Sequence, residues 1–231
     1  ATTEIYTLSL HDALPICYAS VGGERAFDLQ VPHLTLQAGE QVGLRGASGS
    51  GKTTLLHMIA GLLTPDSGRI VVAGTDITAL SEAQRDRLRA SQIGYVFQTF
   101  NLLPAFSAWE NVRLALAFAG IQEDAWAREL LERMGLADRL HHRPSQLSVG
   151  QQQRVAVARA LACRPALVLA DEPTGNLDSA NAGTALGLIR ELCAEAGSAL
   201  LLASHDPAVL ATFDRVDDLG TLAASAPLEV A

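Results

Sequence analysis

The stretch QVGLRGASGSGKTTLLHMIAGLL, residues 41–63, determines how the rest of the chain is interpreted. A short apolar strand leads through glycines at 46, 49 and 51 into an amphipathic helix, and the loop between them matches the pattern GxxxxGK[ST]. Glycine lets successive backbone amides face inward, and the start of the helix adds partial positive charge. The sequence therefore predicts a loop that cradles the phosphates of a nucleotide.

Side chains at the end of this loop have separate predicted roles. Lys52 would bridge the β- and γ-phosphates, Thr53 would supply a hydroxyl to Mg²⁺, and Thr54 would donate to a neighbouring phosphate. Of the 17 basic residues in the chain, Lys52 is the single lysine. This bias indicates a position that needs a compact ammonium rather than a planar guanidinium. The predicted nucleotide-binding residues of the loop are Gly46, Ala47, Ser48, Gly49, Ser50, Gly51, Lys52, Thr53 and Thr54.

Two carboxylates follow an apolar run in ALVLADE, residues 166–172. A continuous apolar run is typical of a parallel strand buried on both faces, and the carboxyl end of such a strand opens at the crevice where ligands bind. Because side chains alternate along a strand, Asp171 and Glu172 are predicted to point to opposite sides. One would hold the metal through water, and the other would polarise the attacking water.

Two further apolar runs end in polar residues. IGYVFQ ends at Gln98, and SALLLASH ends at His205. Parallel strands present their carboxyl ends at one edge of a sheet, so we expect both side chains to lie near the phosphate loop.

A second anion-binding element is predicted in LSVGQQQRVAVARAL, residues 147–161. Ser148 is well placed as the N-cap of a helix, whose first amides and positive dipole would face outward. The phosphates of the same chain are already held at Lys52, so this helix would bind those of another copy. The sequence therefore predicts a head-to-tail homodimer with two nucleotides between the phosphate loop of one copy and this helix of the other.

Together these motifs resemble the ATP-binding subunits of ABC transporters, from Tyr18 to about Val216. The resemblance implies that residues 46–53 are the Walker A loop, that residues 147–151 are the signature, and that Asp171 and Glu172 are the Walker B pair. It implies ATP and Mg²⁺ as cofactors. It also implies integral membrane permease subunits as partners, with the chain bound peripherally at the cytoplasmic face of the inner membrane.

The resemblance also assigns a role to each site residue. The catalytic residues would be Glu172, which activates water, the switch histidine His205 at the γ-phosphate, the Q-loop glutamine Gln98, and Lys52. Thr53, Gln98 and Asp171 would hold the metal, and Tyr18 would place its ring against adenine. Residues acting in trans would be Ser148, Gly150, Gln151 and the D-loop aspartate Asp178.

One position departs from the family pattern. The commonest signature has glycine where this chain has Val149. Ordinary dihedral angles suffice in the first turn of a helix, so we expect Ser148 and Gly150 still to present their groups to phosphate and ATP turnover to survive. The amino-acid sequences around Gln98 and in the signature are similar to those of ATPases of lipoprotein release and macrolide export. Importer ATPases share much of these sequences, so an importer subunit and a non-transport ATPase stay as alternatives.

The expected fold is α/β, a RecA-like P-loop NTPase core with a mainly parallel sheet, a small antiparallel β part and an inserted helical subdomain. Alternating strands and helices from about Tyr18 to Gln98 and from about Pro165 to Val216 would form the core. The helical subdomain would occupy about 99–164. Residues 18–220 would form one ABC ATPase domain, and residues 221–231 a C-terminal tail.

Composition excludes several other classes. The net charge of −8 disfavours a nucleic-acid partner, which normally requires a basic face. No apolar stretch approaches the ~20 residues that cross a bilayer. The three cysteines lack metal-ligand spacing and are typical of a reducing compartment.

The opening residues 1–16, ATTEIYTLSLHDALPI, lack the features of an export signal. Translated back into codons, they resemble a common short-read sequencing adapter whose next base suits the codon of Cys17. We therefore expect residues 1–17 to be an artefactual extension. The alternation of Tyr6, Leu8 and Leu10, which a strand would also show, is then accidental.

Overall fold

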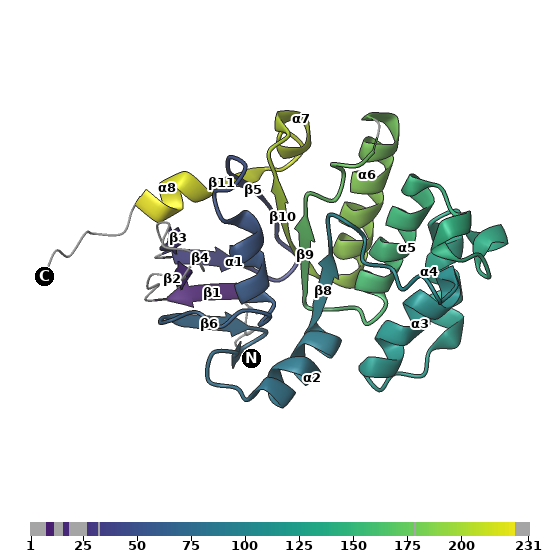
Figure 1. Ribbon diagram of the computed structural model, residues 1–231, viewed down its shortest axis with the longest axis horizontal. Coiled ribbons are helices and arrows are strands. Elements are labelled where there is room, and N and C mark those ends of the chain that lie inside the picture. Colours follow the sequence, from purple (N-terminus) through teal and green to yellow (C-terminus); the bar gives the residue numbers. More distant parts are fainter. Residues whose placement is uncertain (1–7, 12–15, 19–26, 32, 178, 225–231) are drawn as a thin grey trace, which may run out of the picture.

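The computed structural model describes residues 8–11, 16–18, 27–31, 33–177 and 179–224. Figure 1 shows a small antiparallel β part at one end, a parallel sheet in the middle, and a group of helices at the other end. This arrangement confirms the predicted fold class, because the largest sheet is parallel, a smaller one is antiparallel, and helices lie between β8 and β9 in the chain.

The central sheet has five parallel strands in the order β11-β5-β10-β9-β8. The strands are β5 Gln41–Arg45, β8 Ile93–Val96, β9 Leu167–Asp171, β10 Ala199–Ser204 and β11 Arg215–Asp218. Every position of β9 and β10 is buried, as their apolar sequences predict. Ala203 pairs with Leu44 on one side and Asp171 on the other, so the carboxyl ends of three strands reach the same sheet edge.

The antiparallel part consists of a sheet in the order β4-β1-β6-β7 and a separate β2–β3 pair. The strands are β1 Leu8–His11, β2 Ile16–Tyr18, β3 Phe27–Leu29, β4 His33–Leu36, β6 Arg69–Val72 and β7 Thr75–Asp76. Four residues of the opening segment thus pair with β4, and three of them also pair with β6. Alternating apolar residues suffice for such pairing whatever their origin, so the adapter hypothesis stays a prediction.

Helices cover the parallel sheet and fill the far end of the molecule (Figure 1). They are α1 Lys52–Ile59, α2 Glu82–Gln92, α3 Ala108–Phe118, α4 Asp124–Arg133, α5 Val149–Leu161, α6 Ser179–Ala196, α7 Pro207–Leu210 and α8 Leu219–Ala224. One apolar cluster joins α1 to both sheets, and a second joins α3, α4, α5 and α6 to β8, β9 and β10. Among the described residues, no helix has the length and apolar character needed to span a bilayer.

Helix α5 lies directly on β8. A Cβ atom at Gly94 of β8 would come within 2.2 Å of the carbonyl oxygen of Ala160, so glycine permits this close approach. Trp126 packs against the apolar cluster that contains α5 and β8. Its ring nitrogen Nε1 donates a hydrogen bond to the carbonyl oxygen of Ala162 at 2.9 Å. The helix that carries the signature is therefore fixed to the strand that leads to Gln98.

Candidate functional site

The predicted phosphate loop connects β5 to α1. Gly51 is the N-cap of α1 with a φ of 97°, a conformation that glycine adopts without steric strain. At Gly46 a Cβ atom would lie 2.5 Å from Ser50 Oγ, so a larger residue there would displace the Ser50 hydroxyl. The first amides of α1 lack acceptors within the helix, which makes the start of α1 a suitable anion site.

The Lys52 ammonium lies inside this loop. Its Nζ donates to the carbonyl oxygens of Gly46 at 2.7 Å and Ala47 at 3.1 Å, and it lies 3.7 Å from Glu172 Oε1. The side chain is only 8% exposed. Charge-assisted hydrogen bonds to phosphate are stronger than those to neutral carbonyls, so a bound phosphate can recruit this ammonium from its carbonyl partners.

Glu172 follows β9 rather than continuing it. Its φ of 45° lies in the left-handed region, which is uncommon for residues other than glycine. The strand ends at Asp171, so strand alternation does not set the direction of Glu172, and both residues line one pocket. His205 Nδ1 lies 2.8 Å from Glu172 Oε1, and the Ser204 hydroxyl donates to Oε2 at 3.2 Å. These contacts fix the carboxylate in place.

Four neighbouring strands bring the predicted residues to this pocket. β5 leads to the phosphate loop, β8 to Gln98, β9 to the carboxylates, and β10 to His205. The pocket measures about 580 Å³. It is lined by Ser48, Gly49, Ser50, Gly51, Lys52, Thr53, Thr54, Gln98, Asp171, Glu172 and His205. Phosphate-binding amides, an ammonium, two carboxylates and an imidazole thus share one space, which suits phosphoryl chemistry.

Asp171 and Thr53 form a donor set that fits Mg²⁺. Asp171 is 5% exposed, and its Oδ1 has no hydrogen-bond partner among the described residues. Burial raises the pKa of Asp171, and a hydrogen bond from Thr53 acts against that rise. A buried carboxylate oxygen without a partner is unfavourable, and carboxylate and hydroxyl oxygens are hard ligands of the kind Mg²⁺ prefers.

Replacing Asp171 with asparagine is expected to stabilise the protein in the absence of ATP, because the amide removes a buried charge. A gain of about 1 kcal/mol would raise the thermal midpoint by about 2–4 °C. The variant is also expected to lose the additional stabilisation that Mg²⁺ gives in the presence of ATP. Thermal unfolding with ATP, with MgATP and without ligand measures both effects.

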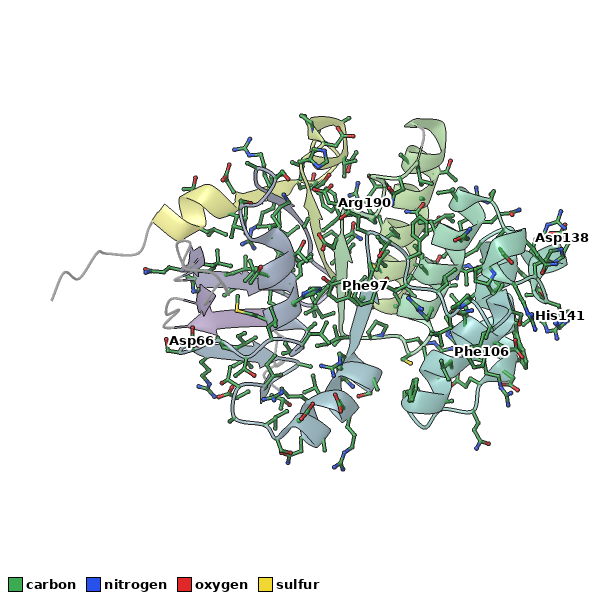
Figure 2. The ribbon with its side chains drawn as sticks, viewed as in Figure 1. Asp66, Phe97, Phe106, Asp138, His141 and Arg190 are labelled. Carbon is green, nitrogen blue, oxygen red and sulfur yellow. The ribbon has the colours of Figure 1, made fainter. Side chains whose placement is uncertain are left out.

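The matched control is Asp138→Asn. Its carboxylate is 72% exposed, and Figure 2 shows Asp138 at the outer end of the helical part. This change is expected to alter neither the midpoint nor the response to Mg²⁺. An Asp171→Asn protein that melts below the wild type, or keeps its full Mg²⁺ response, would contradict the assignment.

Ser148 begins α5 as its N-cap, as the sequence predicts. Its hydroxyl accepts a hydrogen bond from the Gln151 amide at 3.2 Å, and the Gln151 side chain accepts one from the Ser148 amide at 3.0 Å. Val149 is the first helical residue, and its side chain is 49% exposed. In the described part of the chain, Ser148, Gly150 and Gln151 do not line the pocket that contains Lys52. The two predicted anion-binding elements are therefore separate within one chain.

The side chains of two predicted site residues, Tyr18 and Asp178, lie outside the described part of the structure. The backbone of Tyr18 ends β2, and its ring is outside the described part of the structure. Asp178 lies outside the described residues altogether. Their roles at adenine and in trans stay predictions.

Sequence reasoning missed three residues that support the site. Ser204 holds Glu172, Asn176 donates to the carbonyl oxygen of Gln98 at 2.8 Å, and Arg159 donates to the segment that follows Gln98. The position of Ser204 beside His205 was an available signal. No local pattern indicates Arg159, because its acceptors lie 58 and 59 residues away in the chain.

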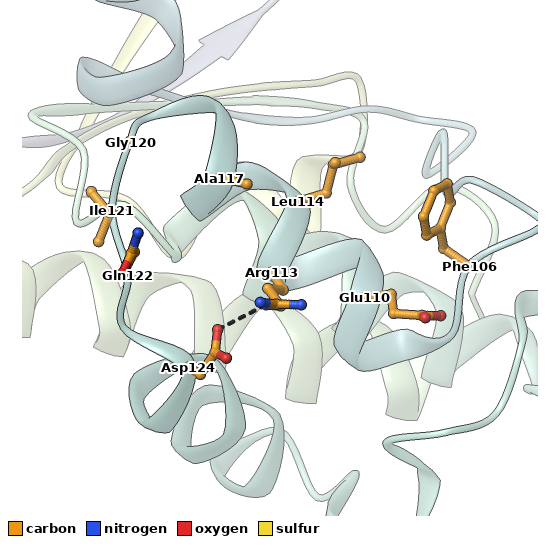
Figure 3. Close-up of a pocket in the computed structure, with 9 residues that line it drawn as sticks. All are labelled: Phe106, Glu110, Arg113, Leu114, Ala117, Gly120, Ile121, Gln122 and Asp124. Carbon is orange, nitrogen blue, oxygen red and sulfur yellow. Dashed lines mark hydrogen bonds and ion pairs between the residues drawn. The ribbon is translucent and has the colours of Figure 1, made fainter.

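A larger hollow of about 760 Å³ lies along α3 and the turn before α4 (Figure 3). Its charged groups already have partners. Arg113 pairs with Asp124 at 2.9 Å, as Figure 3 shows, and Glu110 accepts a hydrogen bond from the Ser107 amide at 2.7 Å. None of the predicted site residues lines this hollow, so the chemistry favours the smaller pocket at the sheet edge.

Comparisons with known proteins agree with this geometry. A family model described as ABC transporter matches residues 29–175. The chain is 49% identical over 186 residues to the lipoprotein-releasing system ATP-binding protein LolD 2 of Caulobacter vibrioides, covering 79% of this chain and 82% of that relative. It is 46% identical over 196 residues to the lipoprotein-releasing system ATP-binding protein LolD of Shewanella denitrificans, covering 82% and 84%.

The structure is similar to a solved dimeric post-hydrolysis state of the ATP-binding cassette MJ0796 bound to ADP and Pi. The TM-score is 0.83 at 36% sequence identity, and the match covers 91% of this chain and 93% of the cassette. A second dimeric structure of the same bacterial ABC transporter cassette gives a TM-score of 0.81 at 35% identity.

Proposed function

The chain belongs to the ABC transporter family as an ATP-hydrolysing subunit, and we propose that it powers a separate membrane permease in the release of lipoproteins. The observation that carries the proposal is the 49% identity, over 79% of the chain, to a relative named for a lipoprotein-releasing system. The pocket at the sheet edge supplies the chemistry. In this proposal the chain works at the cytoplasmic face of the inner membrane.

In the proposed mechanism, the amides at the start of α1 and the Lys52 ammonium hold the phosphates of ATP. Thr53, Gln98 and Asp171 would hold Mg²⁺, which would supply positive charge to neutralise the phosphates of ATP. Tyr18 would stack its ring on adenine. The enclosure of Lys52 and the unpaired Asp171 oxygen support these assignments.

Glu172 is proposed to take a proton from the water that attacks the γ-phosphate. Its Oε1 contacts His205 and its Oε2 contacts Ser204, so the carboxylate faces the phosphate loop in a fixed position. A carboxylate oxygen opposite His205 Nδ1 requires that nitrogen to carry the hydrogen. The other ring nitrogen, Nε2, can donate to the γ-phosphate only in the form of the ring in which it also carries a hydrogen.

We further propose that two copies assemble head to tail. Each phosphate pocket would be completed by Ser148, Gly150, Gln151 and Asp178 of the second copy. The separation of the α5 start from the pocket supports this arrangement, as do the dimeric cassettes that the chain resembles. The exposed Val149 side chain would be covered in the dimer.

The permease is proposed to contact a groove of about 670 Å³ between α2, α3 and the segment after Gln98. Three of the exposed large apolar residues of the described chain, Leu62, Leu103 and Phe118, line this groove. Exposed apolar residues that gather in one hollow are typical of protein–protein contacts. We also propose that residues 18–220 form one ATPase domain, with a helical subdomain at about 99–164 and a tail at 221–231.

The test uses the protein together with the permease of a lipoprotein-releasing system, in liposomes that contain a labelled lipoprotein. We expect ATP-dependent release of the lipoprotein. Phe118→Glu, which places a charge on a side chain 73% exposed in the groove, is expected to reduce co-purification with the permease by about tenfold.

The matched control is Val216→Glu. Val216 is 39% exposed on β11, at the opposite edge of the sheet from β8, and its replacement is expected to leave co-purification intact. Uptake of a solute delivered by a periplasmic binding protein, in place of lipoprotein release, would identify an importer and contradict the proposed function.

A further inference from the structure

Two side chains from distant parts of the sequence hold the segment from Gln98 to Asn101. Asn176 Nδ2 donates to the carbonyl oxygen of Gln98 at 2.8 Å. Arg159 donates through Nη2 to the carbonyl oxygen of Phe100 and through Nη1 to that of Asn101, both at 2.7 Å. Three backbone carbonyls of this short segment are therefore fixed from outside it.

The backbone of this segment is strained. Phe100 and Asn101 have φ values of 61° and 48°. These values lie in the left-handed region, which residues other than glycine adopt infrequently. Consecutive residues in this region persist where the surrounding structure holds them. The planar guanidinium of Arg159 presents two parallel donors, which match two neighbouring carbonyls better than a single ammonium would.

The same segment carries a functional group into the phosphate pocket. Gln98 lines that pocket, and the preceding Phe97, labelled in Figure 2, stacks on Tyr95 with 4.1 Å between ring centroids. The strand side of the segment is thus anchored by packing, and Arg159 holds its far side through two backbone carbonyls.

Helix α5 connects this segment to the signature. Arg159 lies eleven residues after Ser148, which is about three helical turns. In the same helix, the buried Gln153 donates to the carbonyl oxygen of Pro173, in the turn after Glu172. One helix thus contacts both the segment that carries Gln98 and the turn that carries Glu172 and Asn176.

We propose that Arg159 is a positioning residue for Gln98. By clamping the carbonyls of Phe100 and Asn101, it makes the Gln98 segment move together with α5, so that displacement of the Ser148 end of the helix reaches the phosphate pocket. The functional part of this proposal rests on the proposed role of Gln98 as a metal ligand. The mechanical part concerns the backbone of residues 98–101 alone.

The test compares Arg159→Gln with Arg154→Gln. Arg154 lies in the same helix and donates to the carbonyl oxygen of Met134 at 3.3 Å, so it offers an arginine of similar setting without contact to the Gln98 segment. Arg159→Gln is expected to lower kcat about tenfold, because a small displacement of a positioned ligand reduces the rate steeply. The Mg²⁺ concentration for half-maximal activity is expected to rise, while KM for ATP changes little. Arg154→Gln is expected to change none of these.

A double-mutant cycle separates positioning from general destabilisation. On a Gln98→Ala background, Arg159→Gln is expected to reduce kcat by less than about twofold, because the group that it positions is already absent. An undiminished tenfold effect on that background would overturn the proposal. Arg159→Lys keeps one charged donor, so its kcat is expected to lie between those of the wild type and Arg159→Gln. This variant replaces Arg159→Gln in the test if the glutamine variant folds poorly.

Hydrogen exchange without nucleotide tests the clamp independently of catalysis. Backbone amides of residues 97–103 are expected to exchange several-fold faster in Arg159→Gln than in the wild type, and at the wild-type rate in Arg154→Gln. Unchanged exchange in Arg159→Gln would overturn the proposal even if turnover falls. A wild-type protein without Mg²⁺-dependent turnover would instead refute the proposed function, and the exchange result would still decide the clamp.

Discussion

Glu172→Gln is expected to bind ATP normally and to hydrolyse it at a rate at least about 10²-fold lower than that of the wild type. Glutamine has the same shape as glutamate but cannot accept the proton of the attacking water, and loss of a general base typically reduces the rate by ~10²–10⁴. The amide oxygen of glutamine can accept from His205, and its NH2 group can donate to the Ser204 hydroxyl oxygen, so the pocket should keep its geometry. Because hydrolysis no longer separates the two copies, the variant should accumulate as an ATP-bound dimer.

Two measurements check this expectation. Phosphate release gives the turnover, and sizing chromatography in MgATP gives the oligomeric state. Glu132→Gln, which makes the same chemical change on the exposed face of α4, is the matched control and should behave as the wild type. Wild-type turnover in Glu172→Gln would refute the role of the carboxylate, and a monomer in saturating ATP would refute the shared site.

The sequence could predict the pocket because its parts obey two local rules. The spacing of Gly46, Gly51 and Lys52 encodes a phosphate loop within eight residues, and each apolar strand of a parallel sheet ends at the same edge. Gln98 and His205 follow such strands, so their meeting with Asp171 needs only the strand topology. No information on side-chain contacts was required for that step.

The orientation of Glu172 could not be predicted in the same way. Strand alternation would place it opposite Asp171, but its φ of 45° takes it out of the strand, so alternation does not set its direction. The hydrogen bond from the Glu172 amide to the carbonyl oxygen of Ala203, at 2.9 Å, ties the turn to β10. A contact between residues 31 positions apart leaves no periodic pattern in the sequence, and the same holds for Arg159 and its acceptors.

The second large effect on ATPase activity is expected from changes at the start of α5. Ser148 lies at an exposed helix N-terminus away from its own Lys52 pocket, so in the proposed dimer it would contact a phosphate held by the other chain. Val149, in place of the glycine of the commonest signature, is the first residue of a regular helix and leaves the cap of Ser148 intact. Function at this helix start is therefore best tested through the pairing of two chains rather than through one chain alone.

Mixing Lys52→Ala chains with Ser148→Arg chains is expected to restore ATPase activity that each variant lacks. In a mixed dimer both lesions fall in one site, and the other site combines an intact phosphate loop with an intact helix start. Loss of one preorganised phosphate donor typically costs ~10²–10³ in rate, so recovery toward half of the wild-type activity per mixed dimer is measurable.

Ser81→Arg replaces a serine in an equivalent capping box at the start of α2, and it separates the loss of a helix cap from the loss of a phosphate contact. That control should remain active alone, because α2 does not line the pocket. Absence of recovery in mixtures where differently tagged chains demonstrably co-purify would show that Lys52 and Ser148 do not act on one nucleotide.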